Sequence, residues 1–188
     1  MMKRVVLLAT LAATVAAFSA VTPAQAGTPH GGLCQLSGTA NFTPGLTAKP
    51  NPAVTYTFTG NVTGCQEGTV STKPAPPGPA TTGSVQASGH AVSKGISCEA
   101  GLSAGSATIT WTSGPYAGKT TSVGFKTYSA GAFTIVSGAV SASGDPNIHV
   151  GDKAESLLAF QTSTPQACAQ GGLSSAQFQG VSGTGWVK

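Results

Sequence analysis

The amino-acid sequence predicts an all-β protein: an antiparallel β-sandwich of Ig-like or Greek-key type, or a small β-barrel, of about eight strands with two disulfides. Short runs of alternating apolar and polar residues recur along the chain, separated by Gly, Pro, Asn or Ser. Long helical periodicity is absent. Alternation with a period of two indicates half-buried strands, and about eight of them at this spacing are typical of sandwiches and barrels.

Residues 1–26 are interpreted as a secretory signal peptide. A lysine–arginine pair precedes an apolar stretch over 5–21, and an A-x-A cleavage site follows at 24–26. The chain has no Arg-Arg pair, which favours the general secretory route. We therefore expect a secreted, extracellular protein with a single domain over 27–188. We expect no membrane attachment after cleavage, because no later apolar run is long enough to cross a membrane.

The exported part carries little charge. It has seven lysines, no arginine and five acidic residues, which leaves a net charge of +2. Nucleic-acid surfaces depend on clustered charge and on arginine side chains, so we expect no nucleic-acid partner. The scarcity of charge favours a neutral polysaccharide or another extracellular protein as the partner. We expect the protein itself to be a monomer.

Eight segments carry the alternating pattern. In the first, Leu36, Ala40 and Phe42 alternate with polar residues, and the proline-rich stretch after it predicts a loop over 43–52. The residues 128–132 predict a hairpin turn. The predicted strands lie near 34–42, 53–63, 83–92, 104–113, 119–128, 131–140, 155–162 and 176–187.

The four cysteines of an exported protein predict two disulfides. Folding the chain back around the loop at 43–52 brings residue 34 opposite roughly residue 64, which pairs Cys34 with Cys65 and leaves Cys98 for Cys168. The two members of the first pair lie on opposite parities of their strands, and a bulge at Gly64 would bring them together. A four-cysteine zinc site would need closely spaced pairs, so we expect no metal there.

Two threonine rows raise the question of a binding surface. Flat threonine arrays suit ice or a polysaccharide, but a sheet with one wet face also needs polar β-branched residues. No repeat carries the rows from strand to strand, so we interpret them as the wet face. The rows are Thr55, Thr57 and Thr59, and Thr108, Thr110 and Thr112.

Two segments supply candidate binding residues. Tyr116 lies in a Gly-Pro-Tyr-Ala-Gly turn and is the aromatic residue best placed to be exposed. The segment 143–155 gathers oxygen ligands around a histidine, but its spacing departs from the helix-loop-helix calcium pattern. We interpret it as an ordinary turn with Asp-Pro and Gly-Asp as its corners. The candidate residues there are Asp145, Asn147, His149 and Asp152.

The sequence offers little for catalysis. It has three histidines, no G-x-S-x-G around any serine, and no free thiol once both disulfides form. Base, nucleophile and orienting group cannot all be named. We expect no enzyme, no catalytic residue and no cofactor.

Several stretches together resemble small secreted all-β proteins of actinomycete bacteria whose function is not characterised. They are the signal ending Pro-Ala-Gln-Ala, the pattern Leu-Cys-x-Leu-x-Gly-x-Ala-x-Phe-x-Pro-Gly-Leu over 33–46, Tyr-x-Phe-x-Gly-x-x-x-Gly-Cys over 56–65, and Cys98. The resemblance implies secretion and a disulfide-bonded β fold. It supplies no catalytic residues.

Three functional hypotheses follow. The leading one is a non-catalytic β-sandwich that binds a polysaccharide, a cell-envelope component or a protein through its surface. The alternative is a β-barrel carrier of a small apolar ligand, which an enclosed cavity lined by Phe, Leu and Val would favour. The third is a glycan-cleaving enzyme that uses carboxylates near Asp145.

Overall fold

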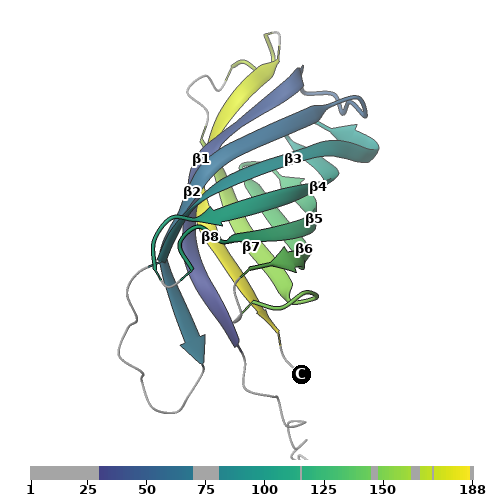
Figure 1. Ribbon diagram of the computed structural model, residues 1–188. Helices are drawn as coiled ribbons and strands as arrows, with labels where there is room; N and C mark the ends of the chain where they lie inside the picture. Colours follow the sequence, from purple (N-terminus) through teal and green to yellow (C-terminus); the bar gives the residue numbers. More distant parts are fainter. Residues whose placement is uncertain are drawn as a thin grey trace, which may run out of the picture.

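The computed structural model describes residues 30–69, 81–114, 116–144, 148–161, 166–170 and 172–186. They form an all-β structure of eight strands, as predicted (Figure 1). Within these residues, no helix is long and apolar enough to cross a membrane. The strands are β1 (His30–Leu46), β2 (Thr55–Thr69), β3 (Thr81–Ile96), β4 (Ala100–Trp111), β5 (Thr120–Ala130), β6 (Phe133–Ser143), β7 (Lys153–Gln161) and β8 (Leu173–Trp186).

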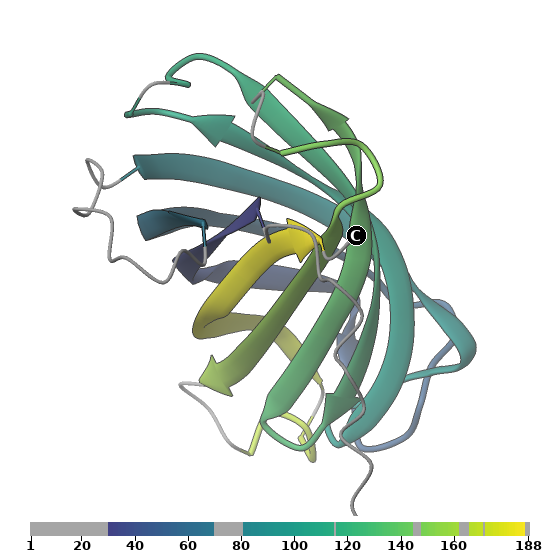
Figure 2. The same cartoon turned by 90° about the horizontal axis from the view of Figure 1, so that it is seen from below.

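The strands close into one antiparallel barrel, which decides between the two predicted architectures. Each strand pairs with the next in the sequence, and β8 pairs with β1 from Trp186↔His30 to Leu173↔Leu46. Viewed from below, the strands follow one another around a ring (Figure 2). A sandwich would leave edge strands unpaired, whereas this closure gives both β1 and β8 a partner on each side.

The first strand is longer than the sequence predicted. We expected a loop from residue 43, but β1 continues through Pro44 to Leu46. The pairing between β1 and β8 is irregular between Asn41 and Leu46. The ladder with β8 therefore needs no N–H donor at Pro44, which has none. The hairpin turn expected at 128–132 forms between β5 and β6, with Gly131 at a φ of 58°.

The alternation along β2 answers the question raised by its threonines. Val54, Phe58 and Val62 are buried inside the barrel, whereas Thr55, Thr57 and Thr59 are exposed on its outer surface. Thr108 and Thr110 on β4 are exposed as well. The rows are therefore the wet side of the wall, as predicted, and their neighbours on β3 are also polar.

Glycines inside the strands allow the wall to curve. Gly38 and Gly60 face each other across β1 and β2, and a Cβ on either would strike the backbone of the other strand. Gly180 on β8 is in the same position against β7, where an added Cβ would lie 2.9 Å from the Cα of Leu158 and closer still to the carbonyl oxygen of Leu157. Such close approach is how glycine permits a tight bend in a barrel wall.

Both predicted disulfides are present: Cys34–Cys65 and Cys98–Cys168. The register of β1 and β2 shifts next to Cys34, and Gly64 adopts a φ of 59°. The bulge predicted at Gly64 therefore brings the two cysteines together although their parities differ. The second bond joins the β3–β4 connection to the β7–β8 connection at one end of the barrel.

Candidate functional site: the barrel interior

The interior of the barrel contains a cavity of about 380 Å³. Its lining is mostly apolar and comes from all eight strands. None of the lining residues is Lys, Arg, Asp, Glu or His. A cavity of this size falls in the range that binds small molecules. The larger apolar lining residues are Leu36, Phe42, Leu46, Phe58, Val62, Val85, Ile96, Ile109, Val123, Phe125, Val136, Leu158, Phe160, Leu173 and Phe178.

Aromatic rings form one side of the cavity. They project inward from β1, β2, β7 and β8, which are consecutive around the barrel. The ring centroids of Phe160 and Phe178 are 4.0 Å apart, and Phe58 meets Phe178 edge to face at 5.5 Å. Phe42 stacks on Phe160 at 6.4 Å. Tilted and edge-to-face contacts of this kind hold aromatic rings in fixed positions, so this side of the cavity is preformed.

Hydroxyl groups occupy the facing side, on β4, β5 and β6. Ser103 and Thr127 are direct cross-strand partners, and their hydroxyls are hydrogen-bonded to each other. Ser129 bonds Thr134 in the same way at 2.9 Å. Each hydroxyl can donate one hydrogen bond and accept two, so these groups retain acceptor capacity beyond the bonds they make. Most of the lining beside them is small or apolar.

Tyr56, on β2, contacts this set of hydroxyl groups through Ser103. Its phenol oxygen lies 2.9 Å from the hydroxyl oxygen of Ser103 on β4. The ring passes over Gly89 of the intervening strand β3, where a Cβ would collide with the phenol group. Gly89 therefore makes room for a hydrogen bond that spans three strands, and Tyr56, Ser103 and Thr127 form one polar cluster inside the barrel.

Burial raises the pKa of Tyr56 above its usual value of 10.0, and the hydrogen bond to Ser103 opposes part of that rise. The folded protein then keeps the phenol proton at a pH where the unfolded chain loses it. We expect the free energy of unfolding contributed by Tyr56 to be complete below pH 10 and to decline as the pH rises beyond it. The free energy of unfolding, measured by urea unfolding below and above pH 10, should decrease more steeply with pH for the wild type than for Tyr56→Phe. Parallel pH profiles for the two proteins would contradict this prediction.

Other contacts close the two ends of the barrel. At one end, Cys98 and Cys168 line the cavity, and the backbone N–H of Cys98 donates to the carbonyl of Thr47 in the β1–β2 connection. Towards the other end, the indole nitrogen of the buried Trp111 donates to the hydroxyl of Thr121 at 3.1 Å. The side chain of Trp111 is only 5% exposed.

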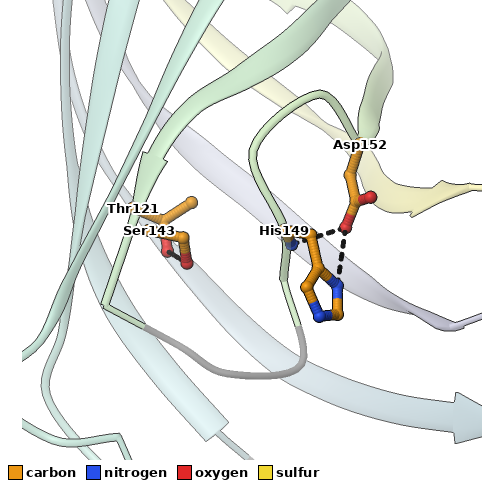
Figure 3. A network of polar contacts seen from close by, with 4 residues as sticks. All are labelled: Thr121, Ser143, His149 and Asp152. Carbon is orange, nitrogen blue, oxygen red and sulfur yellow. Dashed lines mark hydrogen bonds and ion pairs between the residues drawn. The ribbon is translucent and has the colours of Figure 1, made fainter.

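The polar segment 143–155 covers the end of β6, the connection to β7 and the start of β7; Figure 3 shows its residues Ser143, His149 and Asp152. Asp152 is buried and accepts a hydrogen bond from the backbone N–H of His149 at 2.7 Å, while the imidazole Nδ1 lies 3.8 Å from the same carboxylate oxygen. Asp145 and Asn147 lie outside the described residues. In the part that is described, no three His, Cys, Asp or Glu residues come together as metal ligands. The His149–Asp152 contact stabilises the turn.

Tyr116 lies between β4 and β5, but not as the sequence suggested. We expected an exposed ring, whereas its side chain is partly buried and packs against the core cluster. Its turn is held by hydrogen bonds from Gly118 to Trp111 and from Lys119 to Tyr116. A role of Tyr116 in binding stays a prediction.

The hydroxyl side of the cavity was missed by the sequence reasoning. Ser103 and Thr127 lie on the same parity as Ile109 and Phe125, which face inward. The sequence did contain one indication of this polar cluster: polar residues at positions of the strand that otherwise carry inward apolar residues. That indication could be interpreted only once the register between β4 and β5 placed Ser103 opposite Thr127.

The fold and the site together define an eight-stranded up-and-down antiparallel barrel with an uncharged, mainly apolar cavity and two disulfides. No protein-family model, curated protein or solved structure matches the chain. Its function must therefore be inferred from its own residues.

Proposed function

We propose that the protein is a non-catalytic carrier that binds a small, uncharged, mainly apolar molecule inside the barrel. The observation that carries this proposal is the cavity of about 380 Å³ with its aromatic side formed by Phe58, Phe160 and Phe178. Up-and-down barrels of eight strands are just wide enough to hold one small ligand. Burial of apolar ligand surface against these rings supplies the affinity, at roughly 25 cal/mol per Å².

The lining supports an uncharged ligand. A buried carboxylate or ammonium needs an opposite charge or several hydrogen bonds, because transfer of an unpaired ion out of water is very costly. The lining holds no side chain that is charged at neutral pH, since Tyr56, the one titratable lining group outside the disulfides, keeps its proton there. A fatty acid or another anion would enter without a counter-charge, so the proposal favours neutral molecules.

The hydroxyl groups support a ligand with an uncharged oxygen function. Tyr56, Ser103 and Thr127 face a cavity whose other side is aromatic. A ligand hydroxyl or carbonyl placed here would complete their hydrogen bonds and fix the orientation of the molecule. The proposed ligand class is therefore a hydrocarbon skeleton with a hydroxyl or carbonyl group.

The cavity changes the order of the hypotheses. The surface-binding hypothesis depended on an exposed Tyr116 and on the segment 143–155, where Asp152 is buried in a turn contact. A carrier needs neither. We also propose that the protein acts outside the cell; its two disulfides support this, because such bonds persist in oxidising compartments.

The test is a pair of fluorescent probes that differ in charge. N-phenylnaphthylamine is apolar and neutral, and anilinonaphthalene sulfonate is its anionic relative. We expect saturable binding of the neutral probe with one site per chain, and binding of the anionic probe at least about tenfold weaker, because the sulfonate finds no counter-charge. Fluorescence titration of the purified protein measures both.

Two substitutions on one strand locate the site. Ala107 on β4 lines the cavity, and its neighbour Ser106 is exposed on the outer surface. Ala107→Phe should fill the cavity and abolish binding of the neutral probe, whereas Ser106→Phe adds the same ring outside and should leave binding unchanged. Circular dichroism confirms that each variant is folded. Equal binding by the two variants, or tighter binding of the anionic probe, would overturn the proposal.

A further inference from the structure

A continuous apolar stripe crosses the outer wall of the barrel. One outward residue from each of five adjacent strands, β4 to β8, lies in the same cross-strand row, because each is the direct register partner of the next. Adjacent strands are about 4.8 Å apart, so the row extends over roughly 19 Å along the curved wall, half of the circumference of the eight-stranded barrel. The residues of this outer stripe are Leu102 (42% exposed), Tyr128 (55%), Ile135 (54%), Leu157 (50%) and Val181 (46%).

The stripe has mainly apolar neighbours on one side and mainly polar neighbours on the other. The adjacent row towards the β5–β6 turn contains Ala130, Phe133 and Ala159, and Phe133 is 57% exposed. The adjacent row on the other side carries Lys126, Ser137 and Glu155. A contiguous patch of large apolar side chains with a charged border is typical of an interface.

The rest of the outer wall shows that the stripe is not a general property of the barrel. Its outward residues on β2 and β3 are polar throughout the middle of each strand. On β4, Thr108 and Thr110 are exposed at the end away from Leu102. Apart from Leu33 on β1, which is 60% exposed, the large exposed apolar side chains of the described strands lie on β4 to β8, opposite a threonine-rich and serine-rich half of the wall.

In place of the monomer expected from the sequence, we propose that the middle of the outer stripe, on β5, β6 and β7, is the interface of a symmetric homodimer, with a second copy of this chain as its occupant. The charged border supports a second copy. Lys126 on β5 and Glu155 on β7 lie in one row, one strand to either side of Ser137 on β6. A two-fold axis along β6 exchanges the two flanking strands and so places Lys126 opposite Glu155 of the partner subunit.

The same axis matches the apolar residues. It places Ile135 against Ile135 of the partner subunit and Tyr128 against Leu157 of the partner subunit. Leu102 and Val181 lie two strands from the axis on either side, where the barrel wall curves away from the partner. Isologous interfaces have this self-complementarity, in which one patch serves both sides. The aromatic residues Tyr128 and Phe133 are suited to the centre of such an interface.

The test is the mass of the protein in solution. Sedimentation equilibrium of the protein purified from expression of the full chain should give twice the mass of one chain. Ile135→Lys places two like charges on the axis and should weaken the dimer roughly a hundredfold or more, because it truncates and charges the centre of the interface. Thr57→Lys, on the threonine face of β2, is the matched control and should leave the dimer unchanged.

Charge exchange tests the proposed axis. Lys126→Glu should weaken the dimer about tenfold, since it faces Glu155 of the partner subunit with a like charge. Glu155→Lys should do the same, and the double variant Lys126→Glu with Glu155→Lys should restore the dimer. A monomer at every concentration would overturn the proposal, including one that binds lipid vesicles or another protein through the stripe. Failure of the double variant to recover would overturn the axis. None of these outcomes depends on ligand binding inside the barrel.

Discussion

Gly180→Ala is expected to lower the free energy of unfolding by about 3 kcal/mol or more, because the added methyl group collides with the neighbouring backbone. Its Cβ would lie 2.9 Å from the Cα of Leu158 and closer still to the carbonyl oxygen of Leu157. Backbone atoms inside a ladder cannot move aside as a flexible side chain can. The wall must therefore open between β7 and β8, with loss of their hydrogen bonds. Urea unfolding followed by circular dichroism measures the change.

Gly183 provides the matched control on the same strand. A Cβ added there would have its nearest neighbour at 3.7 Å, an ordinary contact. Gly183→Ala should change the free energy of unfolding by less than about 0.5 kcal/mol, as most surface substitutions do. Similar losses in the two variants would show that glycine is needed for the conformation of β8 in general and not for the close approach at Gly180.

Loss of the disulfide between Cys98 and Cys168 is expected to have the other large effect. The bond closes a loop of 70 residues, for which the chain-entropy relation gives about 4 kcal/mol of stabilisation. The bond also links the β3–β4 connection to the β7–β8 connection at one end of the barrel. Both of its cysteines line the cavity. The variant Cys98→Ala with Cys168→Ala should therefore lose stability and bind the neutral probe more weakly, as measured by urea unfolding and fluorescence titration.

The other disulfide separates the two effects. Cys34 and Cys65 lie on β1 and β2, which are already hydrogen-bonded to each other, and they do not line the cavity. Their double alanine variant should also be destabilised, by about 3.5 kcal/mol for a separation of 31 residues, but it should keep the affinity for the probe. Equal loss of affinity in both double variants would mean that the loop-joining bond has no special role at the cavity.

The sequence predicted most of the local structure because alternation has a direct physical cause. The wet and buried faces of β2 and the bulge at Gly64 follow from residues close together in the chain. Closure into a barrel does not, because it depends on the pairing of β1 with β8, the two ends of the fold. The same alternating strands would suit a sandwich, so the sequence left both open.

Neither the cavity nor the outer stripe could be predicted from the sequence, for related reasons. Leu157 and Leu158 are both apolar, and only the fold shows that Leu158 faces inward and Leu157 outward. Ser103 and Thr127 are common residues for a wet face, yet they point into the barrel. Where both faces of a strand are apolar, or where the inner face is polar, alternation no longer distinguishes inside from outside.

The meander order of the strands has a consequence for how the chain assembles. Every strand has a partner next to it in the sequence, and only the closing pair, β1 with β8, joins distant segments, so hairpins can form with little loop-closure entropy. The final junction joins the two ends and requires the 14 residues of β8. Without β8, β1 and β7 would present open edges, which are templates for pairing with other chains. The pairing of β8 with both of them therefore protects the whole barrel against edge-to-edge aggregation.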